Sequence, residues 1–161
     1  ELNSRLQFYL EEVVREVIRK NKKALISGRF SIDLHDLDVS VYSDSKWLAF
    51  ILNQILANSI KYRKEDSAGI EWYAVKEKEK VILCLKDRGI GIPVMDAGRV
   101  FEKGFTGSNG RSGKKSTGIG LYLSKKLCEK MGHKICLTSK EGEGCEVLIT
   151  FPKGSMTGFL E

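Results

Sequence analysis

The sequence has few residues that cross-link or interrupt a chain, with four cysteines and two prolines in 161 residues. The cysteines, Cys84, Cys128, Cys136 and Cys145, form no C-x-x-C pair and have no neighbouring histidine at zinc-site spacing. This pattern argues against a disulfide framework and against a structural zinc site. We therefore expect buried, reduced thiols, as in a cytosolic protein.

Long apolar stretches are missing too. The longest, Trp47 to Leu52, is far shorter than the roughly 20 residues of a membrane-spanning helix. No signal-peptide pattern is present at the start of the chain. Because the sequence opens with Glu1 instead of methionine, we expect a domain excised from a longer protein. The sequence says nothing about whether that longer protein has a membrane segment elsewhere.

Acidic residues are outnumbered, because 21 Asp and Glu against 27 Lys and Arg give a net charge of +6. A basic domain indicates an anionic partner, and nucleic acid is the first candidate. Much of the excess, however, lies in the glycine-rich segment 103–115 and at Lys61 and Arg63. This concentration favours a local phosphate site, so we expect no nucleic-acid partner.

The composition that remains is that of one globular domain, with 42% hydrophobic and 30% charged residues. Hydrophobic periodicity predicts the secondary structure. Helices are expected at 3–21, 47–62, 94–101 and 117–131, and strands at 29–34, 39–42, 69–75, 81–85, 134–138 and 145–151. This order predicts an α+β fold of two layers, in which helices cover one face of a single mixed, mainly antiparallel sheet. The domain is expected to span 1–152, with a flexible loop at 103–116 and a frayed tail at 153–161.

The helix predicted at 47–62 has two distinct faces. An apolar or small stripe at i, i+3, i+4 and i+7 spacing suits packing on a sheet; it comprises Leu48, Ile51, Leu52, Ile55 and Ser59. A second face carries Gln54, Asn58, Lys61 and Tyr62 within roughly 100° of one another, whereas Asn53 points elsewhere. An amide oxygen can bind Mg²⁺, an ammonium can bind phosphate, and an aromatic ring can pack against a base. By itself, the pattern is more typical of an ordinary amphipathic helix.

Three Gly-x-Gly turns follow this helix. In the segment 87–91, DRGIG, Asp87 at a strand end precedes two glycines. A carboxylate there can accept from an exocyclic amine such as adenine N6, while the glycines let the backbone approach a flat ring. The segment 117–121, TGIGL, opens a helix whose N–H groups suit phosphate. The segment 142–144, GEG, is either a third part of this site or only a hairpin turn.

Two other nucleotide motifs fail on spacing. None of the Gly-x-Gly pairs has a glycine three residues further on, so the dinucleotide fingerprint is absent. The segment 113–116, GKKS, ends like a P-loop, but Ser108 stands where its first glycine belongs and Lys115 where Ser or Thr belongs. No predicted strand precedes it either, so we reject the P-loop.

Taken in order, these motifs resemble the ATP-binding catalytic domain of bacterial sensor histidine kinases, which belongs to the GHKL superfamily of gyrase, mismatch-repair and chaperone ATPases (the Bergerat fold). NQILANSIKY resembles the Asn box, DRGIGIP the first glycine box, VFEKGFTG the Phe box, STGIGLYLSKKLCEKMG the second glycine box and EGEGCEVLITFP the third. The resemblance runs from about Leu6 to Pro152. Within the family, the sequence is similar to membrane-bound kinases of Gram-positive bacteria that respond to cell-envelope antibiotics.

The resemblance implies a role for each matching residue. Asn58 would hold Mg²⁺, Lys61 would reach phosphate, Tyr62 would line the nucleotide pocket and Asp87 would take the adenine amine. The base pocket would be shaped by Gly89, Gly91, Ile92 and Cys145. The phosphates would be cradled by the second glycine box, Ser116, Thr117, Gly118, Ile119, Gly120 and Leu121. The lid over ATP would be 103–116, with Arg111, Lys114 and Lys115 as phosphate partners and Phe101 and Phe105 as anchors.

Three positions depart from the family pattern. Gln54 stands where many members have Asn, and where the hydrolytic branches have a Glu that acts as general base for water. A glutamine cannot take a proton, which argues against an ATPase, whereas transfer to an imidazole relies mainly on positioning and charge stabilisation. Ser116 replaces a glycine. Cys145 replaces the common Thr or Ser, so a hydroxyl contact near the base becomes at best a weak SH contact.

The histidine that would receive the phosphoryl group is missing. His35 is followed by only half of the acceptor pattern and His133 follows a helix-ending glycine, so both are expected to be structural. The resemblance thus implies an ATP- and Mg²⁺-dependent kinase domain that phosphorylates a separate dimerisation hairpin and, through it, a response regulator. We expect a monomeric fragment from the cytoplasmic part of a membrane-anchored kinase. The alternatives are a nucleotide-binding regulatory module of a degenerate kinase, a GHKL ATPase and a serine kinase.

Overall fold

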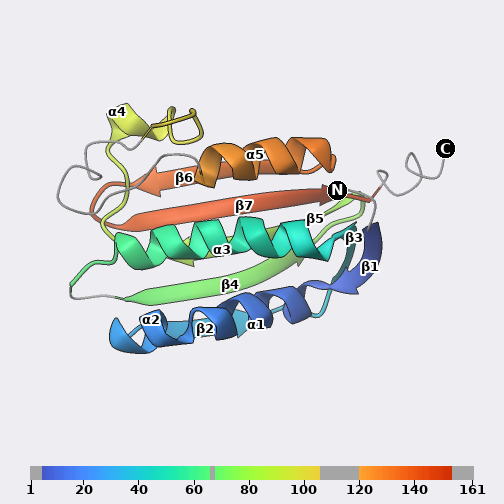
Figure 1. Ribbon diagram of the computed structural model, residues 1–161, viewed down its shortest axis with the longest axis horizontal. Coiled ribbons are helices and arrows are strands. Elements are labelled where there is room, and N and C mark those ends of the chain that lie inside the picture. The colour runs from blue at the N-terminus through green and yellow to red at the C-terminus, as the bar shows by residue number, and fades with distance from the viewer. Residues whose placement is uncertain (1–4, 66–67, 106–119, 154–161) are drawn as a thin grey trace.

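The computed structural model describes residues 5–65, 68–105 and 120–153 as a two-layer fold, in which α1, α3 and α5 lie across one face of a sheet (Figure 1). The helices are α1 (Leu10–Lys20), α2 (Lys22–Ser27), α3 (Ser45–Lys61), α4 (Val94–Ala97) and α5 (Gly120–Lys130). The strands are β1 (Arg5–Tyr9), β2 (Ser31–His35), β3 (Ser40–Asp44), β4 (Gly69–Lys76), β5 (Lys80–Asp87), β6 (Lys134–Lys140) and β7 (Gly144–Pro152). The α+β prediction is confirmed.

The main sheet has five strands in the order β2-β4-β5-β7-β6. Only the β2–β4 pair is parallel, and the other three pairs are antiparallel, so the expected mixed, mainly antiparallel sheet is confirmed. The expectation of a single sheet is wrong, because β3 pairs with β1 in a separate two-stranded sheet.

The first predicted helix begins too early. Residues 5–9 form β1, and α1 starts only at Leu10. Leu6, expected on the apolar face of the helix, is 68% exposed, whereas Val13 and Val17 are buried as expected. The backbone of β1 pairs with β3, more than 30 residues away, and this long-range pairing overrides the local helical pattern.

Helix α3 forms as its sequence predicts and lies between α1 and α5 (Figure 1). Asp44 Oδ1 accepts from the backbone N–H of Lys46 at 3.0 Å and of Trp47 at 3.1 Å, which caps the helix; such a cap contributes about 1 kcal/mol. The predicted apolar stripe is buried, with every member at most 6% exposed: Leu48, Ile51, Leu52, Ile55 and Ser59. Each buried Leu or Ile contributes about 2 kcal/mol by leaving water.

The four cysteines are free thiols. Cys84 and Cys128 are buried and Cys145 is half-buried, but Cys136 is exposed, so the expectation of burial is wrong for this one. Cys136 lies on β6 with its side chain on the face of the sheet opposite Ile135, and none of the helices in the described residues covers that face. Within the described residues, no helix is both long and apolar enough to cross a bilayer.

His133, in the connection between α5 and β6, is buried, and its Nε2 lies 2.8 Å from the Ser43 hydroxyl. Burial, with the nearby positive charge of Arg5, lowers the pKa of His133 to about 4. The imidazole is therefore neutral at pH 7 and structural, as the sequence suggests.

Candidate functional site

The carboxylate of Asp87, at the end of β5, is the centre of the predicted site. Its Oδ1 accepts from the backbone N–H of Gly89 at 2.9 Å and of Cys145 at 3.2 Å. Its Oδ2 accepts from the Ser59 hydroxyl of α3 at 2.8 Å. A carboxylate has about four acceptor positions, so these three bonds fix its orientation and leave an acceptor position on Oδ2.

The turn after Asp87 packs closely on two other segments. A Cβ at Gly89 would lie 2.5 Å from the carbonyl oxygen of Tyr62, and the N–H of Ile90 donates to that same oxygen at 3.0 Å. Gly91 has φ +75°, and a Cβ there would lie 2.5 Å from the carbonyl oxygen of Lys140. Both glycines are therefore required for close backbone approach, which brings the end of α3 and the β6–β7 turn to the same turn.

The third glycine turn is part of this assembly and not merely a hairpin. The N–H of Gly142 donates to the carbonyl of Ile90 at 2.7 Å, and Lys64 Nζ donates to the carbonyl of Gly142 at 2.7 Å. Gly144 has φ +125°, and any Cβ there would overlap the backbone oxygen of Asp87. The alternative that the sequence leaves open is thus decided by contact between the two turns.

Ser139 is a residue of this region that the sequence motifs do not indicate. Its hydroxyl lies 2.6 Å from the donating N–H of Ile92, and Cys145 Sγ donates to it at 3.4 Å. Burial raises the pKa of the Cys145 thiol to about 11, so the thiol stays protonated. Ser139 and the N–H of Cys145 together tie β6 and β7 to the Asp87 loop. Nothing in the sequence marks this serine, because its role depends on strand register.

The C-terminal end of α3 brings the polar residues of the predicted Asn box together. Asn58 is half-buried, and Lys61 Nζ lies 5.4 Å from the centroid of the Tyr62 ring. Burial raises the pKa of the Tyr62 hydroxyl. Asn53 points elsewhere, as predicted, since its Oδ1 accepts from Asn21 at 2.8 Å on the side of α1 and α2.

Gln54 of α3 contacts the start of α5. A Cβ at Gly120 would overlap the Oε1 of Gln54, so only glycine fits there without moving the glutamine side chain. Leu121, the next residue, is half-buried and packs against the core. The Asn-box helix and the second glycine box therefore meet at this point, where Gln54 and Gly120 are 66 residues apart in sequence.

Several predicted phosphate residues lie outside the described residues. These are Arg111, Lys114, Lys115, Ser116, Thr117, Gly118 and Ile119. Of the predicted lid anchors, Phe101 packs against the core with Lys125 Nζ 5.6 Å from its ring centroid. Phe105 lies under the guanidinium of Arg99 at 4.6 Å.

A separate groove of about 440 Å³ lies between α1, α2 and the edge strand β2. Four cationic side chains line it, Arg15, Arg19, Lys22 and Arg29, over an apolar floor. It contains none of the residues that the motifs assign to nucleotide binding, so it is not the predicted site.

The comparisons with known proteins agree with this arrangement. The profile of the histidine kinase-, DNA gyrase B- and HSP90-like ATPases matches residues 43–155, which include every box quoted from the sequence. A two-layer fold with these boxes around Asp87 and α3 is that of an ATP-binding catalytic domain. The chain belongs to this family of ATPase domains.

Two relatives define the branch. Sensor histidine kinase YxdK of Bacillus subtilis (strain 168) is 36% identical over 143 residues, which are 88% of this chain and 44% of YxdK. Sensor protein kinase GraS of Staphylococcus aureus (strain MRSA252) is 37% identical over 123 residues, 76% of this chain and 35% of GraS. The resemblance to sensor histidine kinases of Gram-positive bacteria is confirmed. The chain spans less than half the length of these curated relatives.

Solved structures confirm the fold. The catalytic domain of histidine kinase ThkA superposes with a TM-score of 0.77 at 23% identity, covering 92% of this chain and 95% of that one. ThkA in complex with the response regulator protein TrrA gives a TM-score of 0.76 at 21% identity, covering 94% of this chain and 42% of that one. The predicted Bergerat fold is therefore correct.

Proposed function

We propose that this chain binds ATP with Mg²⁺ and transfers the γ-phosphoryl group to a histidine on a separate helical hairpin domain of its parent kinase. The observation that carries the proposal is the carboxylate of Asp87, which three donors orient and which keeps an acceptor position on Oδ2. Family membership supports ATP as the nucleotide.

The base end of the site follows from this geometry. An exocyclic amine can donate to Asp87 Oδ2, next to the bond from Ser59. We propose that a flat ring lies beside the turn that carries Gly89, Gly91 and Ile92, which the close contacts of Gly89 with Tyr62 and of Gly91 with Lys140 hold in place. Cys145 contributes its backbone N–H to Asp87, while its thiol contacts Ser139.

The phosphate end is formed by the last two turns of α3. Asn58 is half-buried and, within the described part of the chain, its side-chain amide has no hydrogen-bond partner, so the amide oxygen is available to a cation. An amide oxygen is a ligand type that Mg²⁺ accepts alongside phosphate oxygens, and the residue therefore fits the ion. When bound, Mg²⁺ neutralises charge on the phosphates. Lys61, the last residue of α3, supplies a further positive charge.

Gln54 favours phosphoryl transfer over hydrolysis. Its side chain lies against Gly120, the first residue of α5, within the second glycine box. An amide there can orient groups by hydrogen bonding but cannot deprotonate a water molecule. We propose that Gln54 and Lys61 position the nucleotide for transfer, and that Gly118, Thr117 and Ser116 contact the phosphates, with Arg111, Lys114 and Lys115 of the 103–116 lid.

The partners and setting follow from the relatives. We propose that the phosphoryl group passes from the hairpin to a response regulator, the class of protein with which ThkA forms its complex. The parent is proposed to be a membrane-anchored kinase with this domain, residues 1–152, in the cytoplasm, and the isolated domain to be a monomer that binds no nucleic acid. We also propose that the parent kinase responds to cell-envelope antibiotics.

The test combines the chain with the parent's hairpin domain, produced separately, and γ-labelled ATP with Mg²⁺. We expect an acid-labile, base-stable phosphate on the hairpin. Asn58→Ala should abolish labelling, while the matched control Asn53→Ala, which changes an amide on another face of α3, should retain most of it. ATP binding without labelling would instead indicate a regulatory module, and release of inorganic phosphate by the isolated chain would indicate a hydrolase.

A further inference from the structure

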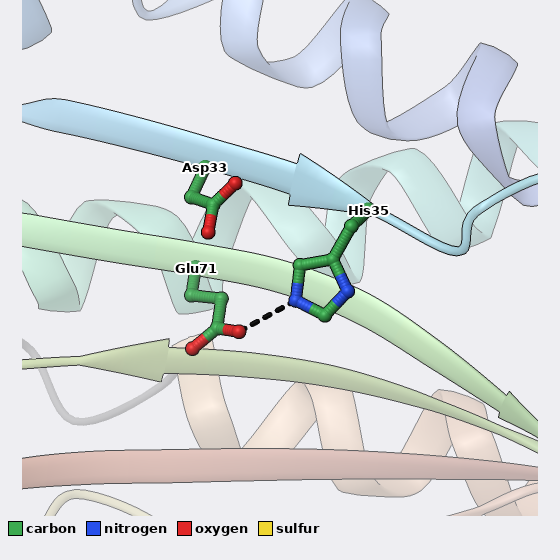
Figure 2. Close-up of side chains that lie close together, drawn as sticks. All are labelled: Asp33, His35 and Glu71. Carbon is green, nitrogen blue, oxygen red and sulfur yellow. Dashed lines mark hydrogen bonds and ion pairs between the residues drawn. The ribbon is translucent and has the colours of Figure 1, made fainter.

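A cluster of polar side chains lies on the face of the main sheet opposite α1, α3 and α5. Along β2, Ile32 and Leu34 pack against the core, so Asp33 and His35 alternate to the opposite face. Glu71 of β4 stands directly across from Asp33 in the parallel β2–β4 pair. Figure 2 shows Asp33 and His35 on one strand and Glu71 on its neighbour, with their polar atoms turned toward one another.

The spacing of the three side chains is that of a small cation site. One ligand atom from each, two carboxylate oxygens and one imidazole nitrogen, lie within 4.8 Å of one another. His35 Nε2 is 2.6 Å from Glu71 Oε2. Because adjacent hydrogen-bonded strands set these positions, the cluster is held by the backbone of the sheet and not by a loop.

The imidazole is oriented in the way that a metal-binding histidine requires. Its second nitrogen, Nδ1, lies 2.8 Å from Asp36 Oδ2. Its ring stacks on that of Tyr73, with centroids 5.1 Å apart and planes inclined by 3°. Histidine ligands of metals characteristically give their other ring N–H to a carboxylate, which fixes the tautomer and ring orientation.

We propose that Asp33, His35 and Glu71 bind a divalent transition-metal ion of the Zn²⁺ type, with Asp36 as a positioning residue. One imidazole and two carboxylates suit Zn²⁺, whereas Mg²⁺ prefers oxygen ligands alone. Three protein ligands leave further coordination positions for water. The site is distinct from the nucleotide site, because Asp87 contacts α3 on the helix-covered face of the same sheet.

A proton competes with the ion. Hydrogen bonds to Asp36 and Glu71 raise the pKa of His35 to about 9, so the ion must displace a proton at pH 7. Asp33, which lies near His35, adds negative charge. Lys86 of β5, which stands opposite Glu71 in the β4–β5 register, adds a positive charge that opposes binding of the ion. Because a proton and the ion compete for the same imidazole nitrogen, binding of the ion should be tighter at pH 8 than at pH 7.

The experiment is calorimetric titration of the whole chain with ZnCl₂ at pH 7 and pH 8. It uses a Cys136→Ser background, since the exposed thiol of Cys136 could itself bind zinc. We expect one ion per chain and at least tenfold weaker binding in His35→Gln and in Glu71→Gln. Asp36→Asn should weaken binding less. MgCl₂ should give no comparable binding.

Imidazole NMR signals of the unsubstituted chain provide a second readout that does not depend on variant folding. Zn²⁺ should shift the signals of exposed His35 and leave those of buried His133 unchanged. Zinc binding that His35→Gln leaves intact, or unshifted His35 signals at millimolar Zn²⁺, would overturn the proposal and leave the cluster as an ion-pair network only. Equal binding of Mg²⁺ would overturn the assignment of the ion class.

Discussion

Replacing Asp87 by Asn tests how the site distinguishes purines. The substitution keeps the shape of the side chain, and its amide oxygen can still accept from the N–H groups of Gly89 and Cys145. The amide nitrogen then takes the place of Oδ2 and can donate to the Ser59 hydroxyl, which is able to reverse its role. The fold should therefore lose little stability.

The effect on ATP should be much larger. The acceptor position of Oδ2 becomes an N–H donor, which faces the exocyclic amine of adenine, itself a donor. A lost hydrogen bond to a charged group is worth about 1.5–3 kcal/mol, and this corresponds to about 10- to 150-fold weaker binding. Guanine carries a carbonyl oxygen at the same ring position, so GTP should bind no worse to Asp87→Asn than to the original chain.

Calorimetry with ATP and GTP, on the original chain and on Asp87→Asn, measures the two affinities. The control is Asp38→Asn, an identical change of charge at an exposed position remote from the turn; it should leave both affinities unchanged. If Asp87→Asn weakens ATP and GTP equally, the carboxylate does not read the exocyclic amine, and the assignment of the base pocket is wrong.

Three further predictions concern the ion, the glycine turns and pH. Asn58→Ala should abolish the tightening of nucleotide binding by Mg²⁺ in calorimetry, and an unchanged magnesium effect would exclude Asn58 as the ligand. Gly144→Ala should lower the free energy of unfolding, measured by denaturant titration, by about 3 kcal/mol or more, because it adds backbone strain and overlap with Asp87. The control Gly142→Ala, at φ +84° but in open space, should lower it by only about 1–2 kcal/mol. Equal losses would contradict the role of close contact between Gly144 and Asp87. His133 has a pKa of about 4 in the folded state, below its ordinary 6.5, so its stabilising contribution is present above pH 6.5 and is lost as pH falls. The free energy of unfolding should drop by about 1.5 kcal/mol from pH 6.5 to pH 5, and His133→Gln should remove that slope.

Much of the fold can be predicted from local patterns. Helix α3 begins beside its Asp44 cap and buries the predicted stripe, because 3.6-residue periodicity and capping are local properties. The hairpins β4–β5 and β6–β7 lie where alternation and charged or glycine-rich turns indicate them. The error at residues 5–9 has the opposite origin, since β1 exists only because β3 offers its backbone a partner.

In the candidate site, too, some residues can be predicted from the sequence, whereas some contacts depend on the tertiary structure. The boxes indicate Asp87, Asn58 and the glycines, because the chemistry of these residue types is visible in the sequence. The bond from Ser59 to Asp87 and the role of Ser139 depend on which segments become neighbours in space. The contact between Gln54 and Gly120 is of the same kind.

The sequence by itself determines the kind of domain this is, because each box states a local requirement: a cap, a carboxylate before bare backbone, an amide one helical turn from a lysine. Only the tertiary structure decides how the boxes meet, and it alone brings His35 to Glu71 across 36 residues. The physical reason is that strand pairing and backbone contact join distant segments through hydrogen bonds common to all residues, which leave no mark of partner or register in the local sequence.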